Sequence, residues 1–368
     1  MKKYTQSPRH LRYIQRRARR SLEARLRFKR YRREKNRVEN HLSRTEQKVV
    51  RQKKQFVARG YTEVKAPSIL SFVRNPEDVS EFIAQLRKLE KMRNPVWVIL
   101  KHVKEIDYDG INVLLSAVVR FQARRIAFNG DLPSDLGVRK IIEESGFFEY
   151  IRDDSFKDED HYELSATKIY THAKKNVDSV LGQKIIESAS KTVWGGARRC
   201  PGVQRVFLEL MQNTNNHASF EGEGEKHWWL SVKHIKEEKR VIFSFVDYGV
   251  GVFRSLKNKK PNDKFFGAIE QLYNKALTSI TRHGDSGVLK LIFEGELHRT
   301  ATGKTYRGKG LPGIFQAFQQ NQISNLAMIT NNVVFNSSKD TYEPLHNGFE
   351  GTFIYWELNE RNSKLVTL

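Results

Sequence analysis

Glu209 and Asn213 form one candidate site in this sequence, because their residue types and spacing suit catalysis and metal binding. They stand four residues apart in the stretch Glu209-Leu-Met-Gln-Asn213, so on a helix they share one face. A carboxylate there can polarise water as a general base. An Asn oxygen one turn further on can complete the shell of a magnesium ion whose other ligands are phosphates and waters. The alternative is a solvated helix face without a function.

Asp247, Gly249 and Gly251 form a second candidate site directly after the apolar run Val241 to Val246. A carboxylate at the end of a strand can accept a hydrogen bond from an exocyclic amine such as that of adenine. The two glycines permit a turn in which a base approaches the backbone closely. The alternative is an ordinary turn between a strand and a loop.

A third candidate is the glycine-rich stretch Gly308-Lys309-Gly310-Leu-Pro-Gly313, which leads into an apolar helical segment. Glycines at a helix N-terminus expose backbone N–H groups to an anion, which the helix dipole favours. The preceding residues 299–307 are polar and are typical of a flexible lid, which argues against a dinucleotide-binding unit. Because Gly310 follows Lys309, the stretch also lacks the Gly-Lys-Ser/Thr of a Walker P-loop.

Taken in this order, the three elements resemble the N, G1 and G2 boxes of the GHKL ATPase superfamily, over roughly residues 203–358. The resemblance implies an ATP-binding domain that uses Mg2+. It implies that Glu209 is the base, Asn213 the magnesium ligand, Asp247 the adenine reader, Gly249 and Gly251 the base-pocket turn, and Gly308, Lys309, Gly310 and Gly313 the phosphate lid. Thr352, after Gly351, resembles the threonine of a late strand that supports the adenine-binding Asp.

The sequence departs from the family between Gly251 and Gly308, where a long stretch includes a helical pattern at Phe265 to Ile280. We expect this stretch to form either a specific lid or a surface that binds a partner. The Glu at the head of the N box is similar to that of the hydrolysing members, so we expect an ATPase whose nucleotide state switches a lid or a dimer. A protein kinase that acts in trans on a regulatory partner, and a non-enzymatic interaction module stabilised by nucleotide, are the alternatives.

The candidate residues need helices and antiparallel strands to position them. We expect helices at 167–189, 203–218, 265–280 and 314–320, and strands at 228–233, 241–246, 325–330, 332–336 and 351–358. This order indicates an α+β sandwich over residues 160–368, of the Bergerat type that the GHKL resemblance implies. His172 falls in the first predicted helix, where a sensor kinase of the family keeps its phospho-accepting histidine, but it lacks that family's acidic neighbour and proline.

Residues 60–155 alternate between strand and helix patterns and predict a smaller α/β domain. We expect helices at 78–92, 111–121 and 138–145, and strands at 96–100 and 125–128. The stretch Ile106 to Ile111 resembles the strand–Asp-Ser-Ser/Thr-Gly–helix motif of STAS domains, the fold of anti-sigma-factor antagonists. Asp109 occupies the position of the phosphorylatable hydroxyl and cannot accept phosphate in the usual serine-kinase reaction. The alternative is an ordinary N-cap region for the following helix.

Residues 1–59 form a basic arm with a helical pattern. They hold 22 Lys or Arg residues and four Asp or Glu residues, a net charge of +18 out of +23 for the whole chain. The clusters are Arg16 and Arg17, Arg19 and Arg20, and Arg32 and Arg33. Such clusters favour binding to the phosphate backbone of nucleic acid. The alternatives are an acidic regulatory protein partner, or a second copy of the chain covering the narrow apolar stripe of the arm.

The remaining composition bounds the class of protein. No run of about 18 apolar residues predicts a transmembrane helix, and we expect no secretory signal. The single cysteine, Cys200, excludes an internal disulfide, so we expect a cytoplasmic protein.

Overall fold

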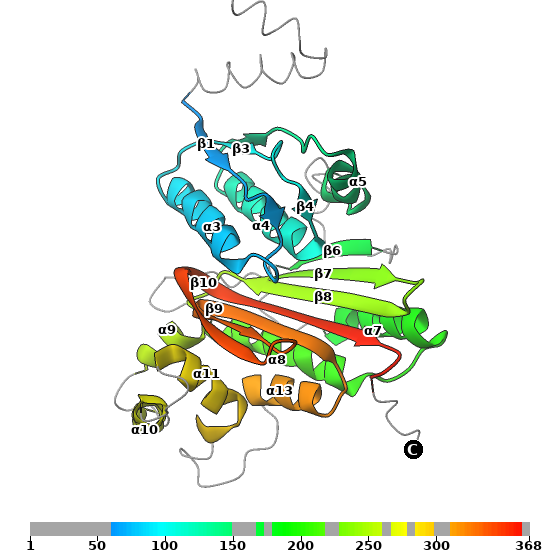
Figure 1. Ribbon diagram of the computed structural model, residues 1–368, viewed down its shortest axis with the longest axis vertical. Helices are drawn as coiled ribbons and strands as arrows, with labels where there is room; N and C mark the ends of the chain where they lie inside the picture. The colour runs from blue at the N-terminus through cyan, green and yellow to red at the C-terminus, as the bar shows by residue number, and fades with distance from the viewer. Residues whose placement is uncertain are drawn as a thin grey trace, which may run out of the picture. The chain divides into compact units, whose positions relative to one another are not determined.

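The computed structural model describes residues 60–148, 167–172, 179–217, 228–259, 266–277, 284–297 and 310–362. It is an α+β protein with both parallel and antiparallel sheets, as the sequence predicted (Figure 1). Contacts divide the chain after Tyr61, and residues 62–368 form one compact unit. The predicted basic arm, residues 1–59, lies outside the described residues.

The first part of this unit, residues 62–148, is the α/β layer. Its three-stranded parallel sheet has the order β1-β3-β5, and β2 pairs with β4 in a second, two-stranded parallel sheet. The strands are β1 (Thr62–Lys65), β2 (Ile69–Leu70), β3 (Val96–Ile99), β4 (Glu105–Ile106) and β5 (Phe128–Gly130), and the helices are α3 (Pro76–Lys91), α4 (Tyr108–Ala123) and α5 (Leu136–Glu144). The three predicted helices and the apolar strand β3 are confirmed.

The strand predicted at 125–128 was placed too early. Arg125 has a φ of 56°, and the Ile126 N–H donates to the Phe121 carbonyl at 2.8 Å. These residues therefore close the C-terminus of α4 in the manner of a left-handed cap. The strand β5 begins only at Phe128.

The second part of the unit contains a five-stranded antiparallel sheet of order β6-β7-β8-β10-β9. The strands are β6 (Thr167–His172), β7 (Trp228–Ile235), β8 (Arg240–Asp247), β9 (Ser324–Asn336) and β10 (Thr341–Asn359). The strands predicted at 325–330 and 332–336 are one continuous strand, with Asn331 at a φ of 50° where the pairing with β10 is irregular. The strand predicted at 351–358 is the second half of β10.

The helix predicted at 167–189 is wrong in its first part. Residues 167–172 form the edge strand β6, which pairs with β7, and the helix α7 begins only at Ser179. The sequence Thr-Lys-Ile-Tyr-Thr-His is rich in β-branched and aromatic residues, which suit a strand with a partner more than a helix. His172 therefore lies on a strand.

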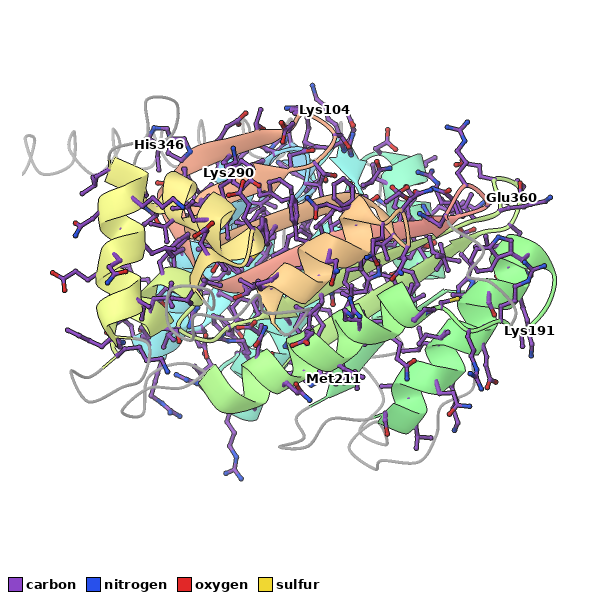
Figure 2. The ribbon with its side chains drawn as sticks, turned by 90° about the horizontal axis from the view of Figure 1, so that it is seen from below. Lys104, Lys191, Met211, Lys290, His346 and Glu360 are labelled. Carbon is purple, nitrogen blue, oxygen red and sulfur yellow. The ribbon has the colours of Figure 1, made fainter. Side chains whose placement is uncertain are left out.

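Six described helices accompany this sheet. They are α7 (Ser179–Trp194), α8 (Pro201–His217), α9 (Val252–Lys257), α10 (Phe266–Leu277), α11 (Gly284–Phe293) and α13 (Leu311–Gln319). The buried face of α8 is formed by Val203, Val206, Phe207, Leu210 and Met211, whose spacing is that of one helical stripe. Figure 2 looks onto this side of the molecule and shows α7, α8 and α13 lying side by side across the sheet.

The two faces of the sheet belong to two cores. Phe243 and Phe245 of β8 pack with α7, α8, α11 and α13 in one core, whereas Val246 packs with α3 and α4 in the other. This division follows from the alternation of side chains along a strand. Asp247, two residues after Phe245, therefore faces the same side as α8 and α13.

The α/β layer covers the other face of the five-stranded sheet. Helix α3 packs against β10, and α4 packs against β7 and β8. Asn112 of α4 is fully buried and donates from its amide to the Ser244 carbonyl at 3.3 Å and to the Trp229 carbonyl at 3.5 Å. Helices α3 and α4 thus lie between two sheets (Figure 1). None of the described helices is long and apolar enough to cross a membrane.

Candidate functional site

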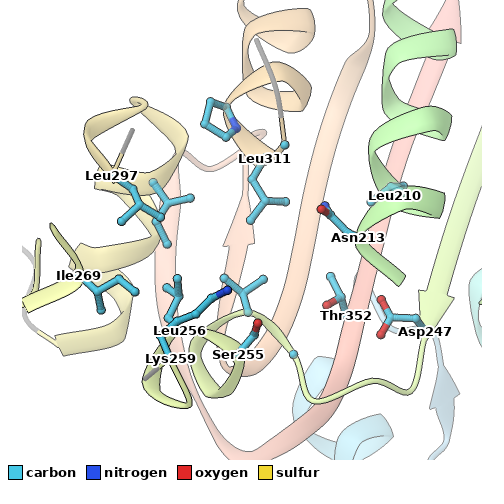
Figure 3. Close-up of a pocket in the computed structure, with 15 residues that line it drawn as sticks. Leu210, Asn213, Asp247, Ser255, Leu256, Lys259, Ile269, Leu297, Leu311 and Thr352 are labelled. Carbon is cyan, nitrogen blue, oxygen red and sulfur yellow. The ribbon is translucent and has the colours of Figure 1, made fainter. Parts of the chain in front are cut away.

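A cavity of about 270 Å3 opens on the helix-covered side of the five-stranded sheet. It lies between α8, α9, α10, the start of α13 and the paired strands β8 and β10 (Figure 3). Its apolar lining is Leu210, Val252, Leu256, Ile269, Ile292, Leu297, Leu311 and Pro312, and its polar side chains are Asn213, Asp247, Ser255, Lys259 and Thr352. An apolar pocket with a few converging polar groups is the usual form of a small-molecule site.

The cavity brings together residues from all four predicted elements. Asn213, Asp247, Gly251, Gly310 and Thr352 line it, although they are far apart in the sequence. Asp247 and Thr352 are direct partners across β8 and β10. Figure 3 shows their side chains next to one another, with Asn213 facing them from α8.

Glu209 lies beside the cavity and does not line it. Its carboxylate accepts a hydrogen bond from the Gly310 N–H at 2.6 Å. Because Gly310 is the N-cap of α13, this contact places the carboxylate at the positive end of that helix dipole. Glu209 therefore contacts the start of α13, and Asn213, one turn further along α8, lines the cavity.

The glycine-rich stretch is described only from Gly310 onward. Gly310 has a φ of +73°, a left-handed conformation that favours glycine, and α13 starts at the next residue. Gly313 is buried inside this helix and does not line the cavity. Gly308 and Lys309 lie outside the described residues.

Asp247 is 7% exposed and ends the strand β8. Its carboxylate accepts the Gly249 N–H at 2.8 Å. Burial raises the pKa of Asp247 to about 7, against the opposing influence of hydrogen bonds from Gly249 and Thr352 and of the positive charge of Arg87. Such a raised pKa is common among functional carboxyls in clefts.

The turn after Asp247 is held by the side chain of Asn331, which packs closely against its backbone. Gly251 has a φ of +76°, and a Cβ there would lie 2.5 Å from Oδ1 of Asn331. The Asn331 side chain accepts the Phe253 N–H at 3.0 Å and donates to the Val250 carbonyl at 2.9 Å. It therefore braces the turn on both sides of Gly251.

Gly351 is required for a similar reason on the neighbouring strand. It has a φ of +139°, and a Cβ there would lie 2.1 Å from the Asp247 carbonyl oxygen. Only glycine allows β10 to approach the end of β8 so closely. The spacing Gly351-Thr352 thus places the threonine beside the carboxyl.

Several wall residues were not found from the sequence. Ser255 lies on the short helix α9 and Lys259 follows the end of that helix, which no periodic pattern indicated. Ile292 lies on α11, a helix that was not predicted. The stretch between Gly251 and Gly308, predicted as a lid or a partner surface, contains α9, α10 and α11, and its helical pattern at 265–280 corresponds to α10, whose Ile269 is part of the cavity wall. Asn331 was also missed, and its only signal is an Asn-Asn pair between two strand-like runs.

A metal ion at this site would depend on more than protein ligands. The described residues contain no group of three or more His, Cys, Asp or Glu side chains that could hold a metal. Asn213 offers one oxygen, and Glu209 lies one turn away. This donor set fits magnesium, which is commonly held by one or two side chains together with substrate phosphates and waters.

Asp109 in the α/β layer is a closed structural carboxyl. It is 4% exposed, and its two oxygens accept the N–H groups of Phe72 at 3.1 Å and Val73 at 3.2 Å. Burial and then the neighbouring Asp107 hold the pKa of Asp109 well above its usual range. The side chain therefore secures the turn after β2, and its burial leaves no open surface for a phosphate.

Cys200 is a buried residue just before α8. Burial raises the pKa of its thiol to about 11, so the thiol stays protonated at neutral pH and is a poor nucleophile.

Comparisons of the chain with protein-family models, with curated proteins and with solved structures find no match.

Proposed function

We propose that the cavity binds the adenine end of ATP and that the protein is a Mg-dependent ATPase of the GHKL, Bergerat-fold type. The observation that carries this proposal is the convergence of Asn213, Asp247, Gly310 and Thr352 on one cavity. Each motif is weak alone. Their meeting in space supports a common ligand with an amine at one end and an anion at the other.

The base would lie against the apolar wall. Asp247 accepts a hydrogen bond from the exocyclic amine, beside Thr352. At about 270 Å3 the cavity falls just below the range of about 300–1,000 Å3 typical of small-molecule sites. We therefore assign it to the base and sugar, with the phosphates toward the N-terminus of α13, where a helix end favours anions.

The reaction would be hydrolysis of the terminal phosphoanhydride. Water attacks the γ-phosphorus, its proton passes to the Glu209 carboxylate, and the bond to the β-phosphate oxygen breaks to give ADP and phosphate. Asn213 would hold Mg2+, which neutralises charge on the phosphates. The predicted lid residues Gly308 and Lys309 belong to the same proposal.

The test is nucleotide binding by wild-type protein and by Asp247→Ala, measured by titration calorimetry with Mg2+ and a non-hydrolysable ATP analogue. Loss of a hydrogen bond to a carboxylate predicts at least about tenfold weaker binding. Glu343→Ala removes an exposed carboxylate from the first half of β10 and should leave binding unchanged. Equal affinities of wild type and Asp247→Ala would refute the assignment.

The fate of the γ-phosphate separates an ATPase from a protein kinase. Incubation of the full chain and a cell extract with ATP labelled on the γ-phosphate should release free labelled phosphate. Label on a protein would instead indicate a kinase acting in trans. Glu209→Gln should abolish either reaction while leaving analogue binding within a fewfold of wild type, since the base acts on water or a hydroxyl. A non-enzymatic module would give neither product.

The basic arm is proposed to bind nucleic acid, on the basis of its net charge of +18. Such binding weakens steeply with salt because each phosphate contact releases counterions. Affinity for a DNA or RNA duplex should fall by at least about tenfold between 50 and 200 mM salt. Removal of residues 1–59 should abolish it. Binding that survives this truncation would assign the contact to residues 60–368.

A further inference from the structure

We propose that Tyr248 is a positioning residue, through which helices α3 and α4 of the α/β layer set the nucleotide affinity of the cavity. The inference rests on the proposed function, because it concerns the same site. Tyr248 is the residue between Asp247 and Gly249 in the second motif. It belongs to the core on the α3–α4 side of the sheet, and not to the cavity wall.

Side chains alternate between the two faces of the sheet at the end of β8, and this alternation places Asp247 and Tyr248 on opposite sides. Asp247 faces the cavity, and Tyr248, the next residue, faces the α/β layer. Tyr248 is 2% exposed. The backbone of one short turn therefore carries the candidate ligand-binding carboxyl on one side and a buried aromatic ring on the other.

The hydroxyl of Tyr248 is bound to α4. It lies 2.5 Å from the Ser116 hydroxyl, and the Ser116 hydroxyl itself donates to the Val113 carbonyl at 2.6 Å. Because a serine has a single hydroxyl hydrogen, the Tyr248 O–H must be the donor to Ser116. The direction of this bond is thus fixed by α4.

The ring of Tyr248 is approached by one arginine from each helix. The guanidinium carbon of Arg120 lies 4.7 Å from the ring centroid, and that of Arg87 lies 5.4 Å away. Both distances are within the range of cation–π attraction. The ring is therefore held by α3 and α4 together.

A buried ion pair joins these two helices. Arg120 of α4 contacts the carboxylate of Glu90 of α3 at 2.7 Å, and Glu90 is 1% exposed. Breaking such a pair leaves a buried charge, so the two helices are strongly coupled. A displacement of either helix would therefore reach the ring of Tyr248.

Arg87 makes a second connection from α3 to the same end of the sheet. Its guanidinium donates to the Glu350 carbonyl at 2.6 Å and lies 3.4 Å from the Glu350 carboxylate. The next two residues are Gly351, which packs against the Asp247 carbonyl, and Thr352, which pairs with Asp247. Helix α3 thus holds both strands that carry the polar end of the cavity.

The turn also transmits displacement toward the rest of the cavity. It runs from Tyr248 through Gly251 into α9, whose Val252, Ser255 and Leu256 line the cavity. A shift of the ring would therefore move the Asp247 carboxyl and the α9 wall together. A partner or modification that displaces α3 or α4 in the α/β layer would change the nucleotide affinity of the cavity by this route.

The test compares Tyr248→Phe and Ser116→Ala, which each remove one partner of the same hydrogen bond, while Ser116→Ala also removes the bond to the Val113 carbonyl within α4. Affinity for Mg2+ and a non-hydrolysable ATP analogue should fall by about three- to tenfold in each variant. The double variant should bind no more weakly than Ser116→Ala alone, since that change already removes the hydrogen bond of Tyr248 to Ser116. Tyr355→Phe is the matched control, because the partly buried Tyr355 also donates its hydroxyl to a buried group, Glu357, on the same sheet but away from the cavity. It should leave affinity unchanged.

A second measurement does not need nucleotide. Hydrogen exchange of the amides at 249–253, in protein without nucleotide, should be several-fold faster in Tyr248→Phe and Ser116→Ala than in wild type. Wild-type affinity together with wild-type exchange in both variants overturns the inference while leaving the proposed function intact. Absence of nucleotide binding by wild type overturns the proposed function. Faster exchange in Tyr248→Phe and Ser116→Ala would then still show that α4 stabilises the turn. If Tyr355→Phe weakened nucleotide affinity as much as Tyr248→Phe, Tyr248 would contribute only to the stability of the fold and the inference would be overturned.

Discussion

At the scale of single residues, the candidate site is governed by close approaches that the sequence shows only in part. The spacing of Asp247, Gly249 and Gly251 predicted a tight turn, and the structure has it. The partner that makes Gly251 necessary, Asn331, comes from β9 and could not be predicted, because no local pattern links a turn to a distant strand. The pairing of Asp247 with Thr352 was inferred through a family resemblance, since spacing alone cannot specify contacts across a sheet.

Asp247 should make stability depend on pH. Burial raises its pKa to about 7, so the folded protein keeps a proton that the unfolded chain releases near pH 4. The stabilisation is complete below about pH 4 and is lost as pH rises to about 7. The free energy of unfolding of wild type relative to Asp247→Asn should therefore fall by up to about 4 kcal/mol over this range.

Urea unfolding of both proteins at pH 4.5, 6 and 8 measures this difference. Other carboxyls, including Asp109, titrate in both proteins and cancel in the comparison. A constant difference between the two proteins from pH 4.5 to 8 would show that Asp247 is ionised throughout.

Gly351 offers a steric test at the same place. Gly351→Ala would put a Cβ 2.1 Å from the Asp247 carbonyl, so we expect a loss of at least about 2 kcal/mol in the free energy of unfolding. Gly182→Ala in α7, where a Cβ would meet nothing within 4 Å, should instead gain about 0.5–1 kcal/mol. Urea midpoints measure both changes, and a loss of similar size in the two variants would contradict the assigned close approach.

At the scale of elements, periodic patterns were reliable where one face is buried. The helix predicted at 203–218 is α8, at 201–217, and the strand predicted at 241–246 is β8, at 240–247. The failures lie where tertiary context decides. Strand β6 exists because it pairs with β7, and the first half of β10 is a polar stretch containing Pro344 that pairs with the end of β9. Neither partner can be read from the local sequence.

At the scale of the whole molecule, the shared core predicts one folding unit. Helices α3 and α4 share one core with residues of both sheets, and Asn112 bonds directly to β7 and β8. We therefore expect α4 and β8 to open together. Native-state hydrogen exchange should give the two elements the same free energy of opening, within about 1 kcal/mol. Opening of α4 at a much lower free energy, with β8 still protected, would divide residues 62–368 into independent domains.

The hydrogen bond from the Gly310 N–H to Glu209 has a kinetic consequence. On the proposed function, the carboxylate occupies a donor that an incoming phosphate would use, so it acts as an internal competitor for the anionic end of the ligand. Adenosine could fill the cavity without disturbing this bond, whereas a nucleotide triphosphate would have to displace it. Base recognition and phosphate engagement then become separate steps, and the displaced carboxylate is free to act on water only after the second step is complete.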